Sequence, residues 1–390
     1  MSIERAGAPA AALWAAAAVG AGCVEELPPL EGTTSLDVEL VSPEPNSPSD
    51  VLGPDDREMT LRIRALDTRN EVDTGFEGTV DLYAHFLGGL TPSLDDTPLA
   101  SAELTGGVSD DVTLELPRVH GEAFVWAEHV EGENPTMATG ASPSLYYREP
   151  YVRDVREPLD EDAPGALEAS PLHDKQVTIR GSRHGERGRL VVNGVFSQGY
   201  TVEDVECEDA AGTPPCTRGD YDAVFVFTFS RPLDHEGRPI RRGDVVSTIS
   251  GGVTHFNGLV QFSFPQTLSA DEAPDRERLA PPARFDQTWL TSLTELGRVE
   301  SAPLAVEGAE LCPLDEDYDT FEQWKLDVGR GCGDAINVIT AERLDEFDPA
   351  PYVGEVIPEV VGVLRPINIG NFHVWIIYPR DEDDLTLPEL

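Results

Sequence analysis

Three observations predict that this 390-residue chain is an all-β, modular protein. Apolar side chains recur at every second position, as at Leu61, Ile63 and Ala65, and this period is typical of strands with one buried face. Clusters of Gly, Asn, Asp and Pro separate the apolar runs about every ten residues. The C-terminal part also contains an internal repeat, which indicates a duplicated β domain.

The first 23 residues have the pattern of an export signal. An alanine-rich apolar run ends at Cys23; it has the length of a signal-peptide core and is too short to span a bilayer as a helix. The GAG segment directly before Cys23 resembles a bacterial lipobox, although a glycine stands where leucine is usual. The resemblance implies that residues 1–23 are a lipoprotein signal peptide and that Cys23 carries the lipid. A plain secretory signal cut near this position is the alternative.

Residues 24–56 combine a tether with the first strand. Pro, Ser, Glu and Asp dominate, as in an extended linker, and Leu36, Val38 and Leu40 alternate with polar residues inside it. Val24 follows the cysteine, so the aspartate that retains lipoproteins in the inner membrane is absent. By this resemblance we expect an exported protein anchored by lipid in the outer membrane, facing the periplasm or the cell surface.

Residues 57–150 read as one sandwich of antiparallel strands. The segment ALDTRNEVDTGFEGTVDL runs from one core strand through turn residues into the next, and further strands are expected in VTLELP and GEAFVWAEHV. No long helical pattern with caps interrupts them. These residues resemble a bacterial immunoglobulin-like domain, which implies a two-layered β-sandwich.

The repeat is clearest near the C-terminal ends of its two copies. GDVVSTISGGVTHFNGLVQFSFPQ, from Gly243, aligns with GEVIPEVVGVLRPINIGNFHVWIIYPR, from Gly354, so that Gly251 and Gly362 correspond. Upstream, the alignment places DVEC beside GAELC, each followed by an aspartate-tyrosine segment. Residues 151–270 resemble the oligonucleotide/oligosaccharide-binding (OB-fold) modules that accompany extracellular bacterial nucleases, and residues 285–390 resemble them more weakly. The resemblance implies two small five-stranded barrels, whose bends glycine favours.

Four further cysteines fall into two local pairs. The first pair brackets a turn-rich segment and the second brackets an acidic one, so an exported protein would form a disulfide within each pair. Zinc is the alternative, but no pair has CxxC spacing. The expected pairs are Cys207 with Cys216 and Cys312 with Cys332.

The charge disfavours nucleic acid as a partner. Asp and Glu number 72 against 28 Lys and Arg, a formal net charge of -44 that would repel phosphates. The basic spot Arg238, Arg241 and Arg242 has acidic neighbours, so we expect local ion pairs there. The barrel core is expected to contain most of the strand aromatics, namely Phe225, Phe227, Phe229, Phe262, Phe264, Trp375 and Tyr378.

No catalytic motif is present. The nuclease resemblance carries no catalytic residue to this chain, and His129 and His255 are expected to be structural. One calcium hypothesis arises from Asp315, Asp317 and Asp319, whose alternating spacing supplies oxygen ligands. The default interpretation of this segment is an acidic loop closed by a disulfide, and no other cofactor is expected.

We therefore expect a non-enzymatic lipoprotein of the cell envelope that acts as a binding or scaffold module for an envelope protein or a glycan. The alternative is an accessory binder of nucleic acid or polysaccharide that works beside a secreted nuclease or hydrolase. If the HFNG and INIGNF turns line one shared groove, a binding function gains support.

Overall fold

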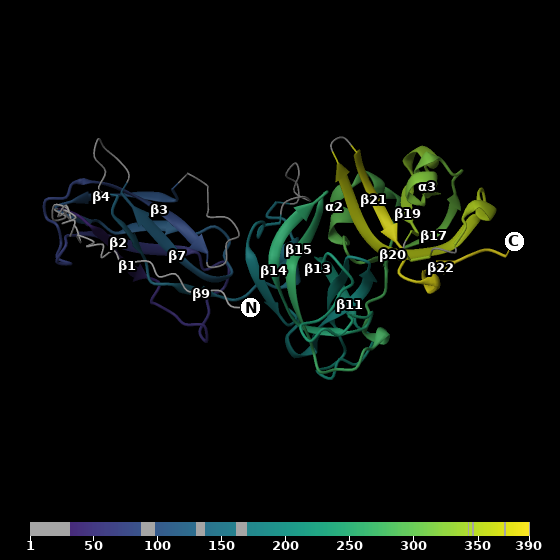
Figure 1. The fold of residues 1–390 in the computed structure, drawn as a ribbon, viewed down its shortest axis with the longest axis horizontal. Coiled ribbons are helices and arrows are strands. Elements are labelled where there is room, and N and C mark those ends of the chain that lie inside the picture. The colour runs from purple at the N-terminus through teal and green to yellow at the C-terminus, as the bar shows by residue number, and fades with distance from the viewer. Residues whose placement is uncertain are drawn as a thin grey trace, which may run out of the picture.

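The computed structural model describes residues 32–86, 98–129, 137–160, 170–341, 343–344, 347–369 and 372–389. Strands dominate and form three sheets that follow one another along an elongated molecule (Figure 1). The predicted all-β class is confirmed. Helices among these residues are short: α1 (Val152–Arg156), α2 (Leu293–Arg298) and α3 (Glu316–Phe321). None of the helices described has the length and apolar character needed to cross a membrane, and Cys23 lies outside the described residues.

The first sheet has nine antiparallel strands and folds around one apolar core. Alternation along the strands produces this core; in β2, for example, Leu61, Ile63 and Ala65 are buried while their neighbours are partly exposed. The sheet curls until β1 contacts β8. Its strands are β1 (Ser35–Ser42), β2 (Glu58–Leu66), β3 (Gly78–Phe86), β4 (Ala100–Thr105), β5 (Val108–Ser109), β6 (Val112–Glu115), β7 (Gly121–Glu128), β8 (Thr139–Ala141) and β9 (Leu145–Tyr147).

The second sheet closes into a ring, which we call barrel 1. Its pairings run β11–β12–β13–β15–β14 and return to β11; β13 and β15 are parallel, and β10 adds to the outside of β14. Apolar side chains fill the ring. Its strands are β10 (Gln176–Arg180), β11 (Gly188–Phe196), β12 (Gly199–Glu206), β13 (Thr217–Phe227), β14 (Val245–Phe256) and β15 (Leu259–Ser269).

The third sheet, barrel 2, repeats this order. The ring runs β17–β18–β19–β21–β20 and returns to β17, again with a parallel contact between its third and fifth strands. Short strands β16 (Ala283–Arg284) and β22 (Leu385–Thr386) pair with β17 and β20. The ring strands are β17 (Pro303–Leu311), β18 (Gln323–Asp327), β19 (Ile336–Ile339), β20 (Val356–Ile369) and β21 (Phe372–Tyr378).

The predicted repeat is right at its C-terminal end and wrong upstream. Gly251 lies on β14 and Gly362 on β20, the fourth ring strand in each barrel. Cys207, however, follows the second strand of its barrel, whereas Cys312 follows the first strand of the other. The acidic segment after Cys312 forms α3, and barrel 1 has a tight β11–β12 turn at this place. The aligned aspartate-tyrosine segments therefore lie at different places: one is inside β13, the third ring strand of barrel 1, and the other precedes β18, the second ring strand of barrel 2.

Both predicted disulfides are present. Cys207–Cys216 closes the connection between β12 and β13, and Cys312–Cys332 ties the end of β17 to the loop between β18 and β19. Such bonds persist in oxidising compartments and are rare in the cytosol. The two disulfides are consistent with an exported protein.

A buried ion pair joins the two barrels. Arg156, at the end of α1, contacts Glu300 at 3.0 Å between Nη1 and Oε1, and both side chains are at most 2% exposed. Arg156 also donates to the carbonyls of Ala223 in barrel 1 and Gly297 in α2, while Glu300 accepts from the Val260 amide. Burial raises the pKa of Glu300 to about 7, against the opposing effect of Arg156. These contacts hold the barrels in one arrangement.

Candidate ligand-binding cleft

The two turns singled out in the repeat meet at one cleft. The amide of Asn368 donates to the carbonyl of Asn257 at 2.8 Å, which joins the end of β20 to the β14–β15 turn. Phe256 and Asn257 from barrel 1 and Pro366 and Ile367 from barrel 2 line a cleft of about 420 Å³. The shared groove that favours a binding function is therefore present, although the tip of the second turn, residues 370–371, lies outside the described residues.

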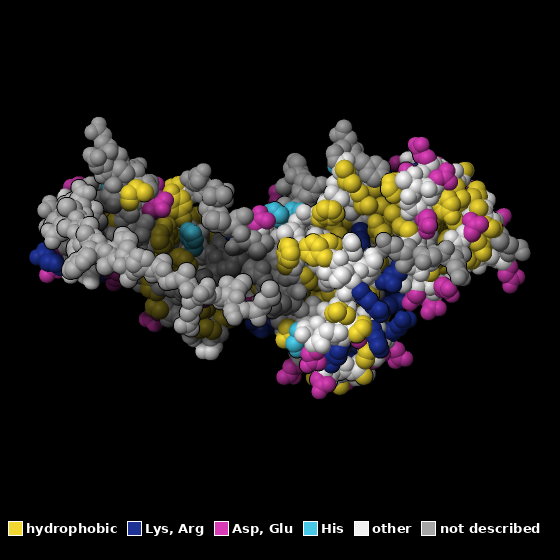
Figure 2. Space-filling view, in the orientation of Figure 1, with side chains coloured by type: hydrophobic (Ala, Val, Ile, Leu, Met, Phe, Trp, Pro, Cys, Tyr) yellow, Lys and Arg dark blue, Asp and Glu magenta, His cyan; other side chains and the backbone are white. Residues whose placement is uncertain are grey.

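Aromatic rings form much of this cleft. Among the residues that the structure describes, the exposed aromatic side chains are Phe229 at 54%, Phe256 at 62%, Phe264 at 79% and Phe321 at 60%. Phe256 and Phe321 line the cleft directly. Phe227 also lines it; its ring centroid lies 4.4 Å from that of Phe229, which lies 5.0 Å from that of Phe264. Figure 2 shows hydrophobic side chains gathered where barrel 1 meets the β20–β21 hairpin.

Two of the exposed aromatic residues have a strained backbone conformation. Phe229 has φ 59° and Phe264 has φ 51°, in the left-handed region that bulky residues rarely occupy. Each such residue costs about 1–3 kcal/mol and persists only where the surrounding structure imposes it, and outliers of this kind cluster at functional sites. Large, exposed, strained aromatics beside a cleft are therefore a functional signal.

Two arginines supply the charge of the cleft. The guanidinium carbon of Arg365 lies 3.7 Å from the ring centroid of Phe196, 4.3 Å from that of Phe225 and 4.8 Å from that of Tyr378. Arg343 lies 5.5 Å from the Phe196 centroid. No Asp or Glu belongs to the described lining, in a chain that has 72 of them. The charged side chains in the described lining of the cleft are therefore both arginines.

The expectation that core packing accounts for the strand aromatics is only partly correct. Phe262 is in the core of barrel 1. Phe225 instead packs in an apolar cluster shared with Val363 of barrel 2, and Phe229 and Phe264 are exposed. Period-two alternation cannot separate the inside of a barrel from a face that a second barrel covers, so the sequence analysis missed the cleft. The sequence feature that could have located the cleft is the pair of aligned turns, HFNG and INIGNF.

A lysine side chain occupies the place where the calcium hypothesis puts the cation. Lys325 Nζ lies 2.6 Å from Asp315 Oδ2 and 3.0 Å from Asp317 Oδ2, so an ammonium group stands where a cation would bind. Asp315 also caps α3 by accepting from the Asp317 amide, and Asp319 is exposed. Within the described ranges no three His, Cys, Asp or Glu side chains are placed to hold a metal.

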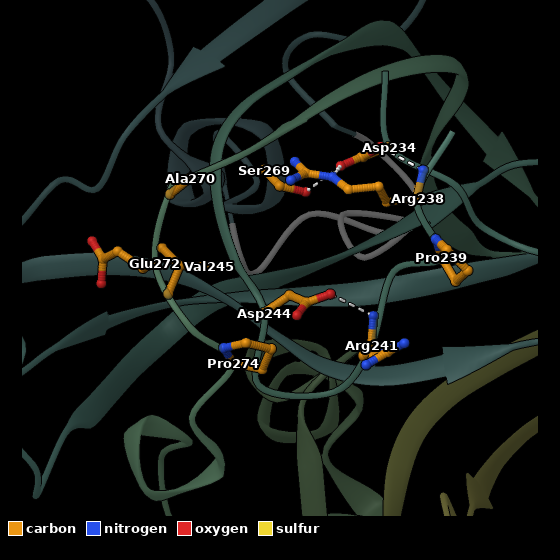
Figure 3. Close-up of a pocket in the computed structure, with 10 residues that line it drawn as sticks. All are labelled: Asp234, Arg238, Pro239, Arg241, Asp244, Val245, Ser269, Ala270, Glu272 and Pro274. Carbon is orange, nitrogen blue, oxygen red and sulfur yellow. Dashed lines mark hydrogen bonds and ion pairs between the residues drawn. The ribbon is translucent and has the colours of Figure 1, made fainter. Parts of the chain in front are cut away.

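The basic spot is partly neutralised by ion pairs of Arg238 and Arg242. The hollow drawn in Figure 3 has a volume of about 320 Å³. Arg238 Nε lies 2.8 Å from Asp234 Oδ2, and the Arg241 backbone amide donates to Asp244 at 2.6 Å. Arg242 reaches Asp381 of barrel 2 at 2.9 Å. These contacts match the local ion pairing expected for Arg238, and they make this hollow a weaker ligand site than the aromatic cleft.

A further unusual group is a pair of buried carboxylates that no sequence motif singles out. Asp204 and Asp222 are both 0% exposed; the Arg183 amide donates to Asp204 and the Arg183 guanidinium to Asp222. Burial raises the pKa of Asp204 to about 7. Because no part of either carboxylate reaches the surface, a substrate cannot contact them in this fold.

The two histidines occupy structural positions. His129 is buried with its ring edge-on to Phe76, at 4.9 Å between centroids. His255 accepts from the Ser170 amide at 2.9 Å and stacks on His173. Neither lines the aromatic cleft.

Comparisons with known proteins leave this chain without a family. No family model and no curated protein matches it. Among solved structures, it has a distant likeness to dimeric latent PorU from Porphyromonas gingivalis, at 12% identity and a TM-score of 0.20. That alignment covers 89% of this chain and 34% of PorU, so the chain spans about a third of the PorU length. A likeness at this level supports no conclusion about fold or function.

Proposed function

We propose that this protein is a non-enzymatic binding module of the cell envelope that holds its ligand in the cleft between the two barrels. One observation carries the proposal: the exposed aromatic side chains of the described residues gather in and beside a single cleft. Contiguous exposed apolar patches on soluble domains mark interaction sites, and a cleft of this volume is typical of ligand pockets.

The proposal includes a fold assignment. In the first sheet, β1–β2–β6 and β3–β7–β9 pair as the A-B-E and C-F-G strands of an immunoglobulin-like sandwich do. The two rings have the strand number of OB-fold barrels. We therefore infer an immunoglobulin-like domain that presents two OB-like barrels.

Lipid attachment at Cys23 is the second part of the proposal. The two disulfides support export, and the acyl chain would place the binding cleft at the envelope through the tether that follows the cysteine.

A second candidate is an accessory binder of single-stranded nucleic acid or polysaccharide. Rings beside arginines, on a barrel of this kind, form platforms on which bases stack. The net charge of -44 opposes a polyanion at long range, so this candidate ranks second.

The binding proposal is tested with the apolar dye 8-anilinonaphthalene-1-sulfonate, whose fluorescence rises on apolar surfaces. We expect the native protein to bind the dye and the double variant Phe256→Ala/Phe321→Ala to bind it at least tenfold more weakly. Val51→Ala, an exposed apolar change in another region, is the matched control. Equal dye binding by wild type and the double variant would overturn the assignment of the cleft.

The anchoring proposal is tested by expression in a Gram-negative host. Wild type should carry a diacyl or triacyl mass increment and fractionate with membranes, while Cys23→Ser should be released. An unlipidated, soluble wild type would leave an exported binder without an anchor.

A further inference from the structure

We propose that the first domain carries a second interaction surface, and that it binds an arginine-rich segment of a partner protein. The surface is the outward face of β3 and β7, which we call the aromatic face. Its residues are Tyr83, His85, Glu122, Phe124, Trp126 and Glu128. They lie in the first sheet and not in the barrels, so the inference goes beyond the proposed function.

Strand pairing brings four rings together on the aromatic face. In the register between β3 and β7, Tyr83 is opposite Trp126 and His85 is opposite Phe124. The ring of His85 stacks on that of Phe124, with centroids 5.4 Å apart, and lies 6.0 Å from that of Trp126. All four side chains are half-buried, while the residues between them on each strand fill the apolar core. The rings therefore form a platform that a partner can contact.

The β1–β2 part of the same sheet has an ordinary solvated face. Its outward side chains are largely charged and form ion pairs: Arg64 contacts Asp37 at 3.3 Å, and Arg62 contacts Asp111 at 2.7 Å. No aromatic side chain lies on β1 or β2. Strand alternation alone therefore requires no rings on an outward face of this domain, and a cluster of apolar surface there marks an interaction site.

The charge of the aromatic face selects the partner. Along β7 its side chains run acid, ring, ring, acid, from Glu122 to Glu128, and the Trp126 indole donates to Glu128 at 3.2 Å. Residues 24–150 contain no lysine, and each arginine in this range pairs with a carboxylate outside the face. Among the described residues, the face thus combines rings and carboxylates without a basic side chain.

Arginine is the side chain that fits such a face. Its planar guanidinium stacks on aromatic rings and also binds a carboxylate through two parallel hydrogen bonds, whereas a lysine ammonium is a compact point charge. The chain's net charge of -44 attracts a basic segment from a distance, and the rings then determine where it binds.

The spacing of the face indicates an extended segment. Side chains two residues apart on a strand are about 6.6–6.8 Å apart, as are Phe124 and Trp126 along β7. An extended peptide with arginine at every second position has the same spacing. Its guanidinium groups can therefore reach both rings and the carboxylates that flank them.

Calorimetry on the full chain tests the proposal with a blocked peptide in which arginine and serine alternate. We expect this peptide to bind at least about threefold more tightly than the same peptide with lysine, because lysine lacks the stacking and the fork. The peptide with citrulline, which has the shape of arginine without its charge, should bind at least about tenfold more weakly than the arginine peptide.

Ring variants separate the face from general attraction to an acidic protein. Phe124→Thr/Trp126→Thr leaves the net charge unchanged and should weaken the arginine peptide at least about fivefold. The cleft variant Phe256→Ala/Phe321→Ala is the matched control and should bind the peptide as wild type does, so this result is independent of the proposed function.

Charge variants supply a second measurement if the ring variant fails to fold. Glu122→Gln/Glu128→Gln should weaken the arginine peptide at least about fivefold. Asp271→Asn/Glu277→Gln changes the net charge equally at two exposed positions outside the first domain and should have less than about a twofold effect.

Two results would overturn the inference. Equal losses in the two charge variants, with no loss in the ring variant, would mean that the peptide binds the acidic surface as a whole. Binding of the neutral oligosaccharide cellohexaose that depends on Phe124 and Trp126, without binding of the arginine peptide, would make the face a glycan platform instead.

Discussion

At the scale of single residues, His255 shows how the fold sets a protonation state. Its Nε2 accepts from the Ser170 amide at 2.9 Å, and its ring stacks on His173 with centroids 4.2 Å apart. Burial lowers the pKa of His255 to about 4, the charges of His173 and Arg156 add to this, and Asp174 opposes it. An accepting nitrogen carries no proton, so the hydrogen bond and the lowered pKa agree.

This pKa predicts a pH-dependent stability. Because the folded pKa lies below the ordinary value of 6.5, the contribution is present above that pH and is lost as the pH falls through about 4. The loss should fall well short of about 3 kcal/mol, the full value at 1.36 kcal/mol for each pKa unit, because solvent partly screens the half-buried imidazole. Urea unfolding between pH 7 and pH 4 should show wild type losing stability relative to His255→Gln. His235→Gln, at an exposed position, should show no such difference; a pH-independent gap for His255→Gln would contradict the account.

At the scale of elements, one glycine in each barrel lets the fourth strand cross the fifth. A Cβ at Gly362 would lie 2.6 Å from the Tyr378 backbone and from Ile377 Cγ2, while one at Gly251 would lie 3.0 Å from the Ser263 carbonyl. Both glycines were predicted from the repeat, and the close approach explains why the two copies share them. The cysteines do not mark equivalent strands of the two barrels, because no comparable close contact fixes their positions.

The unequal clearances predict unequal costs. Gly362→Ala forces the backbone of β20 and β21 apart and should destabilise by about 2–3 kcal/mol, whereas Gly251→Ala should cost about 1 kcal/mol. Gly333→Ala is the control, since nothing lies within 4 Å of its added Cβ. Denaturant unfolding measures all three. A loss for Gly251→Ala as large as that for Gly362→Ala would show that strand flexibility, not the crossing, sets the cost.

At the scale of the whole molecule, the Arg156–Glu300 pair joins linker helix, barrel 1 and barrel 2. Removing one partner of a buried pair leaves the other charge without compensation, at a cost of about 3–5 kcal/mol. Arg156→Met should therefore destabilise the barrels by that order. Arg153→Met, on the same helix but in a partly exposed pair with Glu157, should cost less than about 1 kcal/mol.

The raised pKa of Glu300 gives this prediction a pH signature. A carboxyl whose folded pKa is raised contributes stability below its ordinary value of 4.5, and that stability is lost as the pH rises through about 7. The loss in Arg156→Met should thus be larger at pH 8 than at pH 5, and Glu300→Gln in the same background should restore part of it. Equal losses at both pH values would mean that Glu300 does not change its protonation state between them, against the raised pKa.

The sequence predicts the parts of this molecule better than their contacts. Alternation at Leu61 and Ile63 and the spacing of the cysteine pairs are local, so the all-β class and both disulfides could be predicted. The cleft depends on Phe196 of β11 meeting Arg365 of β20, far apart in the chain. Contacts between residues so far apart in the sequence depend on tertiary packing, which the alternation of apolar residues along each strand does not reveal.

The buried junction has a consequence for ligand affinity. Because Arg156 and Glu300 fix both walls of the cleft during folding, binding requires little further ordering of the protein. Because the protein is pre-organised in this way, binding does not have to offset the conformational entropy that would be lost on closing a hinge. The affinity is therefore higher without any additional contact. Loosening the junction would then weaken binding from a distance, through residues that never touch the ligand.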